Sequence, residues 1–223
     1  MKKILFSIAI VALSVFNVSA QIDEGHVKFN IDMSSTNPEM EMQLAMWQGS
    51  TFEVYFSGDL TRTEMNMGSM MKISNITSAS SDKALMLMSG MMGDIAVKLG
   101  KEDMESSAEK QGEVEITFAD DTKEIQGYNC KKAISTDEEG NESAIWYTEE
   151  IKVNKIGQNY LSDEVPGFPL EFELNRGELK MTMSSTEFNK KLDKKKVKDL
   201  FSIEVPEGYK EMSIEELGSM GGM

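Results

Sequence analysis

The sequence has 223 residues, of which 38 are acidic and 23 are basic, and its formal net charge is −15 at pH 7. This length fits one domain with its own core, and the acidic balance makes the chain a poor binder of nucleic acid. The chain has one cysteine, Cys130, and one histidine, His26, which exclude an internal disulfide and a histidine metal cluster.

The first twenty residues have the composition of a leader. Lys2 and Lys3 precede an apolar run, and Val18-Ser19-Ala20 closes it. This order is typical of a secretory signal peptide over residues 1–20, cleaved near Ala20. We therefore expect an exported protein, periplasmic or secreted, and no later segment is apolar enough to span a membrane.

Strict alternation of apolar and polar residues begins at His26 and continues to Met33, which is the period of a half-buried strand. Turn residues at Ser57-Gly58-Asp59 and Asn175-Arg176-Gly177 predict antiparallel pairing of the flanking strands. The same alternation recurs at Phe52, Val54 and Phe56, at Val114, Ile116 and Phe118, at Leu170, Phe172 and Leu174, at Leu179, Met181 and Met183, and at Phe201, Ile203 and Val205.

The segment from Pro38 to Gln48 is interpreted as a helix, because Asn37 can cap it and Pro38 suits its first turn. A strand is the alternative, since Met40, Met42, Leu44 and Met46 also alternate. Residues 101–112 predict a solvated loop or a short exposed helix.

The stretch from Lys123 to Thr148 predicts two long strands joined at a polar turn from Asp137 to Asn141. Apolar residues change parity across Gly127, which indicates a bulge or a sharp bend inside the first strand. Near the end of the chain, Ser213 and Glu216 can form a capping box. The domains expected are a signal peptide over 1–20, a single β-rich domain over 21–212, and a short C-terminal helix with a flexible tail over 213–223.

These elements predict a mainly β (α+β) fold, a large curved antiparallel sheet or half-open barrel with a few short helices packed on the concave side. Such a shape can leave an apolar cavity between the sheet and its helical cover. The candidate ligand-lining residues are Met40, Leu44, Trp47, Phe52, Val54, Phe56, Met86, Met88, Tyr128, Tyr147, Phe172, Met181 and Met183.

Nineteen methionines are the one compositional oddity. Flexible, polarisable methionine can fill an irregular core, or it can line a surface that repacks around varied apolar ligands. Thioether sulfur also selects Cu(I), so a methionine-based copper binder is an alternative, although His26 and Cys130 are the only residues that could supplement the sulfur ligands.

Enzyme signatures are absent from the sequence, which contains no nucleophile elbow, phosphate-binding glycine loop or zinc spacing. The pair Asp120 and Asp121 is expected by chance in so acidic a chain. We therefore predict no catalytic residue, no metal and no cofactor. The basic block over 190–198 is interpreted as a solvated face, with contact to anionic lipid headgroups as the alternative.

Four ordered motifs carry a family resemblance. They are Ile125-x-Gly127-Tyr128-x-Cys130-Lys131-Lys132-Ala133, Trp146-Tyr147-Thr148, Pro166-Gly167-x-Pro169-Leu170, and Phe201-x-Ile203-x-Val205-Pro206-x-Gly208-Tyr209. Together they resemble the exported bacterial family known as domain of unknown function 4412. That family looks similar in fold to the periplasmic lipoprotein carrier group, whose half-barrel holds acyl chains under a helical lid, and the resemblance brings no catalytic residue.

The sequence thus predicts a non-enzymatic extracytoplasmic binding protein that holds an apolar ligand, a lipid or an acyl chain, in the concavity of a half-barrel. Besides copper binding, a structural or interaction module of the cell envelope with a protein partner is an alternative.

Overall fold

The computed structural model describes residues 22–68, 70–91, 93–109, 114–153, 164–195 and 197–221. The expected signal peptide and its cleavage near Ala20 lie outside these residues, and so does the end of the predicted tail. Within them, no helix is both long and apolar enough to cross a membrane.

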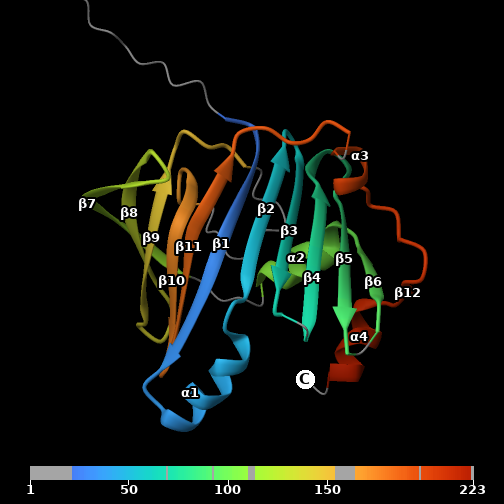
Figure 1. Cartoon of the computed structure of the whole chain (residues 1–223), viewed down its shortest axis with the longest axis horizontal. Helices are drawn as coiled ribbons and strands as arrows, with labels where there is room; N and C mark the ends of the chain where they lie inside the picture. Colours follow the sequence, from blue (N-terminus) through green and yellow to red (C-terminus); the bar gives the residue numbers. More distant parts are fainter. Residues whose placement is uncertain are drawn as a thin grey trace, which may run out of the picture.

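Strands dominate the described chain (Figure 1). They are β1 (Glu24–Ser35), β2 (Thr51–Ser57), β3 (Leu60–Asn66), β4 (Met71–Ser78), β5 (Lys83–Gly90), β6 (Ile95–Leu99), β7 (Glu115–Ile125), β8 (Tyr128–Thr136), β9 (Glu142–Thr148), β10 (Phe168–Arg176), β11 (Leu179–Asn189) and β12 (Lys210–Glu211). The helices are α1 (Pro38–Leu44), η1 (Ala45–Trp47), η2 (Ala79–Ser81), α2 (Lys101–Glu109), α3 (Val197–Leu200) and α4 (Ile214–Gly221).

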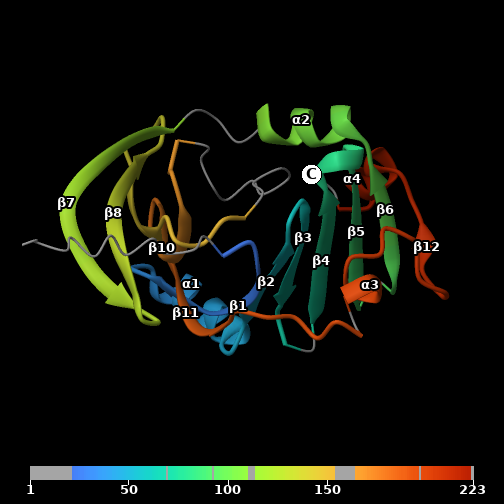
Figure 2. The same cartoon turned by 90° about the horizontal axis from the view of Figure 1, so that it is seen from above.

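All twelve strands form one sheet, in the order β12-β6-β5-β4-β3-β2-β1-β11-β10-β9-β8-β7. Neighbours pair antiparallel, except β12, which runs parallel to β6. Seen from above, the sheet curves into an open arc, with α2 across part of its concave side and α3 against its convex side (Figure 2). The predicted curved antiparallel sheet with few short helices is confirmed.

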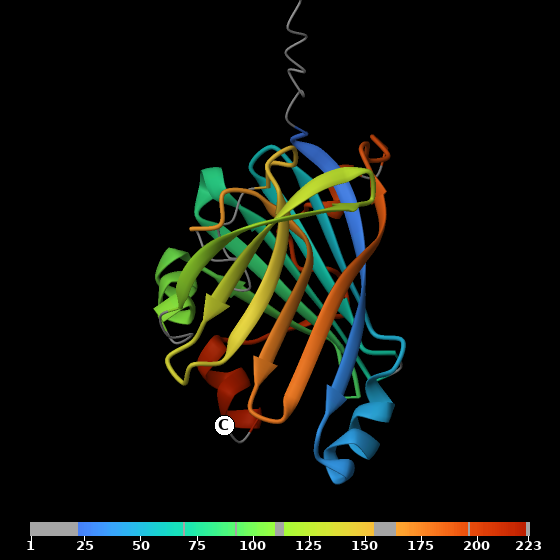
Figure 3. The same cartoon turned by 90° about the vertical axis from the view of Figure 1, so that its left-hand side faces the viewer.

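Strand β1 joins the two halves of the sheet because it pairs with β2 on one side and with β11 on the other. Its alternation from His26 to Met33 is confirmed: Val27, Phe29 and Ile31 are buried. The register with β11 shifts between Lys28 and Phe29, and such an irregularity increases local twist. The side view shows the strong bend of this half of the sheet (Figure 3).

The hairpin predicted around residue 137 is confirmed, but the bend at Gly127 is wrong. Gln126 and Gly127 form a two-residue turn between β7 and β8, with φ angles of 53° and 79°, and Ile125 pairs with Tyr128. Two positive φ angles in sequence are the requirement of a tight hairpin turn. Ile125 and Tyr128 differ in parity because they lie on two paired strands, and no bulge is needed to explain it.

Helix capping follows the predicted chemistry. The Asn37 side chain accepts from the Glu39 amide at 3.0 Å at the start of α1. The Glu216 amide donates to the Ser213 hydroxyl, and the Ser213 amide donates to the Glu216 carboxylate. The predicted capping box is confirmed at α4, and residues 101–109 form the helix α2.

The strand predicted over 201–205 is wrong. Phe201 is buried, and Ile203 and Val205 are half-buried against the convex face of the sheet, but these residues have no ladder partner. Pro206 removes a ladder donor directly after them, and an extended segment lying across a sheet buries alternate side chains just as a strand does. Residues 192–195 and 197–209 form what we call the C-terminal strap.

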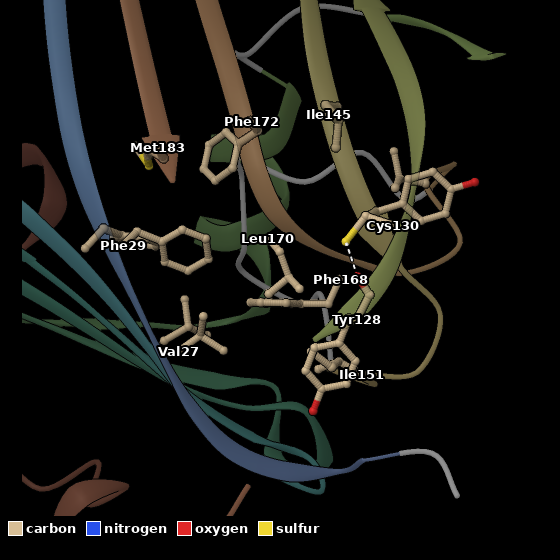
Figure 4. Packing of buried hydrophobic residues seen from close by; sticks show 14 of the residues in the cluster. Val27, Phe29, Tyr128, Cys130, Ile145, Ile151, Phe168, Leu170, Phe172 and Met183 are labelled. Atoms are coloured by element: carbon tan, nitrogen blue, oxygen red, sulfur yellow. Dashed lines mark hydrogen bonds between the residues drawn. The ribbon is translucent and has the colours of Figure 1, made fainter. Parts of the chain in front are cut away.

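The larger core cluster lies on the concave face. Seventeen buried side chains from both halves of the sheet and the adjoining loops form it, and aromatic rings dominate its centre. Phe29 contacts Phe52, Phe168 and Phe172 with ring centroids 5.9 to 6.3 Å apart. Figure 4 shows Phe29 beside Phe168 and Phe172. The curvature of the sheet brings β2 and β10 together: the Phe56 and Phe168 centroids are 6.2 Å apart.

The smaller cluster lies on the convex face of β3 to β6. Ile76, Leu85 and Leu87 point away from the first cluster, and Phe201 of the C-terminal strap covers them. Strand β2 contributes to both clusters, with Phe52, Val54 and Phe56 on one face and Tyr55 on the other.

Candidate functional site

A lateral row of apolar side chains crosses the concave face from β1 to the edge strand β7. Register places Ile31 beside Met183, Met183 beside Phe172, and Phe172 beside Ile145. Ile145 then pairs with Ala133, and Ala133 pairs with Phe118. Directly paired residues share a face, so the row continues from the core to the rim of the sheet.

Exposure rises sharply at the end of this row. Phe172 is 3% exposed and Ala133 is 0% exposed, whereas Phe118 is 57% exposed. Its ring lies edge-on to Tyr147, with centroids 6.2 Å apart. Val114 and Leu174, at 37% each, are further exposed large apolar side chains on or beside strands of this half. Phe118, Val114 and Leu174, with the half-buried Ile116 and Met181, form what we call the apolar rim.

The core cluster that the apolar rim adjoins through Tyr147 is a desolvated environment. Burial raises the pKa of the Tyr147 phenol, and burial raises the pKa of the Cys130 thiol to about 11. Cys130 is 0% exposed and lies in the core cluster, with its Sγ 3.7 Å from the carbonyl oxygen of Tyr128 (Figure 4). A thiol with this pKa is protonated at neutral pH and is a poor nucleophile, so Cys130 acts as a small apolar side chain.

The ligand-lining residues predicted from the sequence separate into three groups. Seven lie together in the concave core: Phe52, Val54, Phe56, Tyr128, Tyr147, Phe172 and Met183. Met181 packs against that core half-buried, and Met86 and Met88 are half-buried on β5. Met40, Leu44 and Trp47 are half-buried on α1 and η1, and neither element has a buried residue.

Of the rim residues, sequence reasoning named Met181 as a site candidate and missed Val114, Ile116, Phe118 and Leu174. The alternation of Val114, Ile116 and Phe118 marked a strand, but it gave no sign that this strand lies at the sheet edge. The available signal was the acidic and polar neighbourhood of Phe118, with Asp120 and Asp121 close by.

A polar network on the opposite face has a structural explanation. Glu53 accepts from Tyr55 at 2.7 Å and lies 2.8 Å from His26, whose ring stacks on Tyr55 with centroids 4.3 Å apart. Arg62 donates to Glu64 and also, at 3.1 Å, to the carbonyl oxygen of Leu200 in the C-terminal strap. These groups satisfy one another. Among the described residues, no three His, Cys, Asp or Glu side chains are placed to hold a metal ion.

Comparison with known proteins gives one family and several structures. A family model described as N-glycanase peptide, N-terminal domain, matches residues 76–205, which is more than half of the chain. No curated protein matches the sequence.

Two crystal forms of PNGF-II are among the similar solved structures. At 16% and 13% identity, each has a TM-score of 0.50 and covers 88% of this chain, but only 33% and 32% of the PNGF-II chain. This likeness concerns the fold. The chain spans about a third of the length of PNGF-II.

Two further structures have lower scores. The lipoprotein LppX of Mycobacterium tuberculosis has a TM-score of 0.35 at 8% identity, covering 76% of this chain and 89% of LppX. A LolA superfamily protein of Nitrosomonas europaea has a TM-score of 0.22 at 9% identity, covering 77% of this chain and 87% of its own. A carrier-group protein is thus among the neighbours, as the sequence resemblance implied, but at these scores neither likeness carries an argument. The resemblance to family 4412 is tested by none of these matches and stays a prediction.

Proposed function

The chain belongs to the family of N-glycanase peptide N-terminal domains, and from that premise we propose that it is a non-catalytic binding domain that holds an apolar ligand, such as a lipid acyl chain, along the apolar rim. The single observation that carries the proposal is the exposure of Phe118 at the end of a row that is otherwise buried.

The shape of the apolar surface favours a chain-like ligand. The exposed apolar side chains of the rim extend from Phe118 on β7 to Leu174 on β10, and these strands are three strand spacings apart, ~15 Å. On the two strands between them, Ser135 and Ser143 follow Ile116 along the ladder and interrupt the apolar surface. A narrow apolar strip with polar neighbours suits an extended hydrocarbon better than a broad protein face.

The non-catalytic part of the proposal is supported by the chemistry of the rim. Its described side chains are apolar and bring no general base or nucleophile, and the nearby Cys130 thiol is protonated at neutral pH. About two thirds of each PNGF-II chain also lies outside the aligned part. We further propose that the protein is exported, on the composition of residues 1–20.

A charge placed in the strip tests the proposal directly. We expect Phe118→Asp to weaken binding of a fluorescent fatty acid ~tenfold or more, since an acyl chain would then have to desolvate a carboxylate. Because Phe118 is more than half exposed, folding should be unchanged in circular dichroism and urea unfolding. Thr117→Asp is the matched control: it adds the same charge on the same strand, at an exposed position on the opposite face.

Two results would contradict the proposal. The first is a folded wild-type protein that binds no acyl probe and carries no lipid in native mass spectrometry after purification without detergent. The second is release of N-linked glycan from a glycopeptide by the purified chain, which would make it a catalyst. Equal binding by the two aspartate variants would show that the ligand binds outside the apolar rim.

A further inference from the structure

Four methionines line one small cavity at the ends of β4 and β5, away from the apolar rim. The cavity has a volume of about 60 Å³, and its lining includes Met70, Met71, Met88 and Met91. Its other lining residues are Ser89, Gly90, Gly93 and Ile95. These ends lie at the bottom of the sheet in Figure 1. Among the described lining residues, every long flexible side chain is therefore a thioether.

The backbone holds these methionines together. Met71 pairs with Gly90 across β4 and β5, and Met88 pairs with Ile73, two residues from Met71. Met71 and Met88 are therefore diagonal neighbours on the same face.

The turns at the ends of these strands are also joined. The Met91 amide donates to the Met70 carbonyl oxygen at 3.4 Å, and the Gly93 amide closes the next turn on Gly90 at 2.9 Å. A Cβ atom at Gly90 would collide with the Met70 carbonyl oxygen, so the close approach of the two turns requires glycine there.

The donor atoms available in the cavity are mainly sulfur. The Ser89 hydroxyl already shares a hydrogen bond of 2.7 Å with the Tyr209 hydroxyl. No histidine, cysteine or carboxylate is among the lining residues that the structure describes. Thioethers bind soft monovalent ions and are poor ligands for Zn²⁺, Mg²⁺ or Ca²⁺.

We propose that Met70, Met71, Met88 and Met91 form a binding site for a soft monovalent metal ion, Cu(I), with thioether sulfur as the ligand. Met91 is 87% exposed and gives the ion access, while Met70, Met71 and Met88 are half-buried. The strong negative charge of the chain favours approach of a cation.

Packing alone does not explain this arrangement. Leucine or isoleucine would fill the same space with fewer rotamers, as Ile95 does on the same cavity. A side chain that is almost wholly in solvent, as Met91 is, contributes nothing to a core. A side chain that must move to coordinate an incoming metal ion needs both a sulfur donor and conformational freedom, and methionine has both.

The test uses Ag(I), a redox-stable probe, and Cu(I) under anaerobic conditions with a reductant. In protein labelled with ¹³C at the methionine methyl groups, we expect Ag(I) to shift four resonances, assigned by single substitutions to the four methionines. The double variant Met71→Leu/Met88→Leu keeps the volume and apolar character, and we expect it to bind either ion ~tenfold or more weakly. The matched control is Met42→Leu/Met46→Leu, which changes two exposed methionines outside the cavity.

Three results would overturn the site. They are methyl shifts confined to other methionines, equal affinity of the cavity and control variants, and binding no tighter than that of free methionine. The metal site is independent of the apolar rim, so acyl-probe binding by Met71→Leu/Met88→Leu should match the wild type, and failure of one proposal leaves the other standing.

Discussion

The two hydrophobic clusters of the sheet are closed in different ways. The concave cluster is sealed by the sheet itself, whose curvature brings Phe56 of β2 against Phe168 of β10. The convex cluster of β3 to β6 is sealed by the C-terminal strap, with Phe201 at its centre. A core closed by hydrogen-bonded strands of one sheet opens locally less readily than a strap without ladder partners. The concave cluster should therefore set global stability, and the convex cluster should set a local opening.

Phe29→Ala should give the largest loss of stability. Phe29 is 1% exposed and contacts three other phenylalanine rings, so removing its ring leaves a cavity between both halves of the sheet. We expect the free energy of unfolding to fall by about 3 to 5 kcal/mol, measured by urea unfolding. Met42→Ala, at a 75% exposed position, is the control and should change it little. If Phe29→Ala lowered the free energy of unfolding less than Phe201→Ala does, the convex cluster, and not the concave one, would set global stability.

Phe201→Ala should have a smaller global effect, about 2 kcal/mol, because detachment of the strap limits the loss. Its main effect should be local. Limited proteolysis at the lysines of the basic block, Lys190 to Lys195, should become faster, while hydrogen exchange of β1 and β11 stays slow. Val205→Ala, at a half-buried position further along the strap, should act in the same direction more weakly. Simultaneous loss of protection in all strands would show that the strap and the concave core unfold as one unit.

The difference between the two clusters also explains which strands could be predicted from the sequence. Strands with one wet face, such as β1 and β11, carry plain alternation and were predicted. Strands β4 to β6 were not, because both their faces are covered: Ile76 and Thr77 are both buried, as are Ala96 and Val97. When adjacent residues are buried on opposite faces, the period of two disappears.

The site was harder to predict than the fold, for a geometrical reason. Alternation placed Phe118 on the same type of face as Phe172, and register later put them in one row. Which of the two is exposed depends on the strand order, with β7 at the edge and β10 inside, and a single sequence does not encode that order locally. The methionine cavity was equally hidden, since Met71 and Met88 meet only through strand pairing.

The smallest predicted effect concerns pH and the contact between β3 and the C-terminal strap. Glu64 is on β3, where its carboxylate lies 2.8 Å from the Lys72 ammonium group and accepts from Arg62, which also binds the strap at Leu200. Burial acts to raise the pKa of Glu64, but the hydrogen bond from Lys72 and the charge of Arg62 outweigh it and hold the pKa below its ordinary 4.5. A carboxyl with a lowered folded pKa contributes stability above its unfolded pKa and loses it as the pH falls through the folded value.

We therefore expect Glu64→Gln to cost at most about 1 kcal/mol at neutral pH and nothing once the carboxyl is protonated. Urea unfolding from neutral pH down to about pH 3 measures this difference, with the exposed Glu207→Gln as the control. A difference between wild type and Glu64→Gln that grows as the pH falls would contradict this sign.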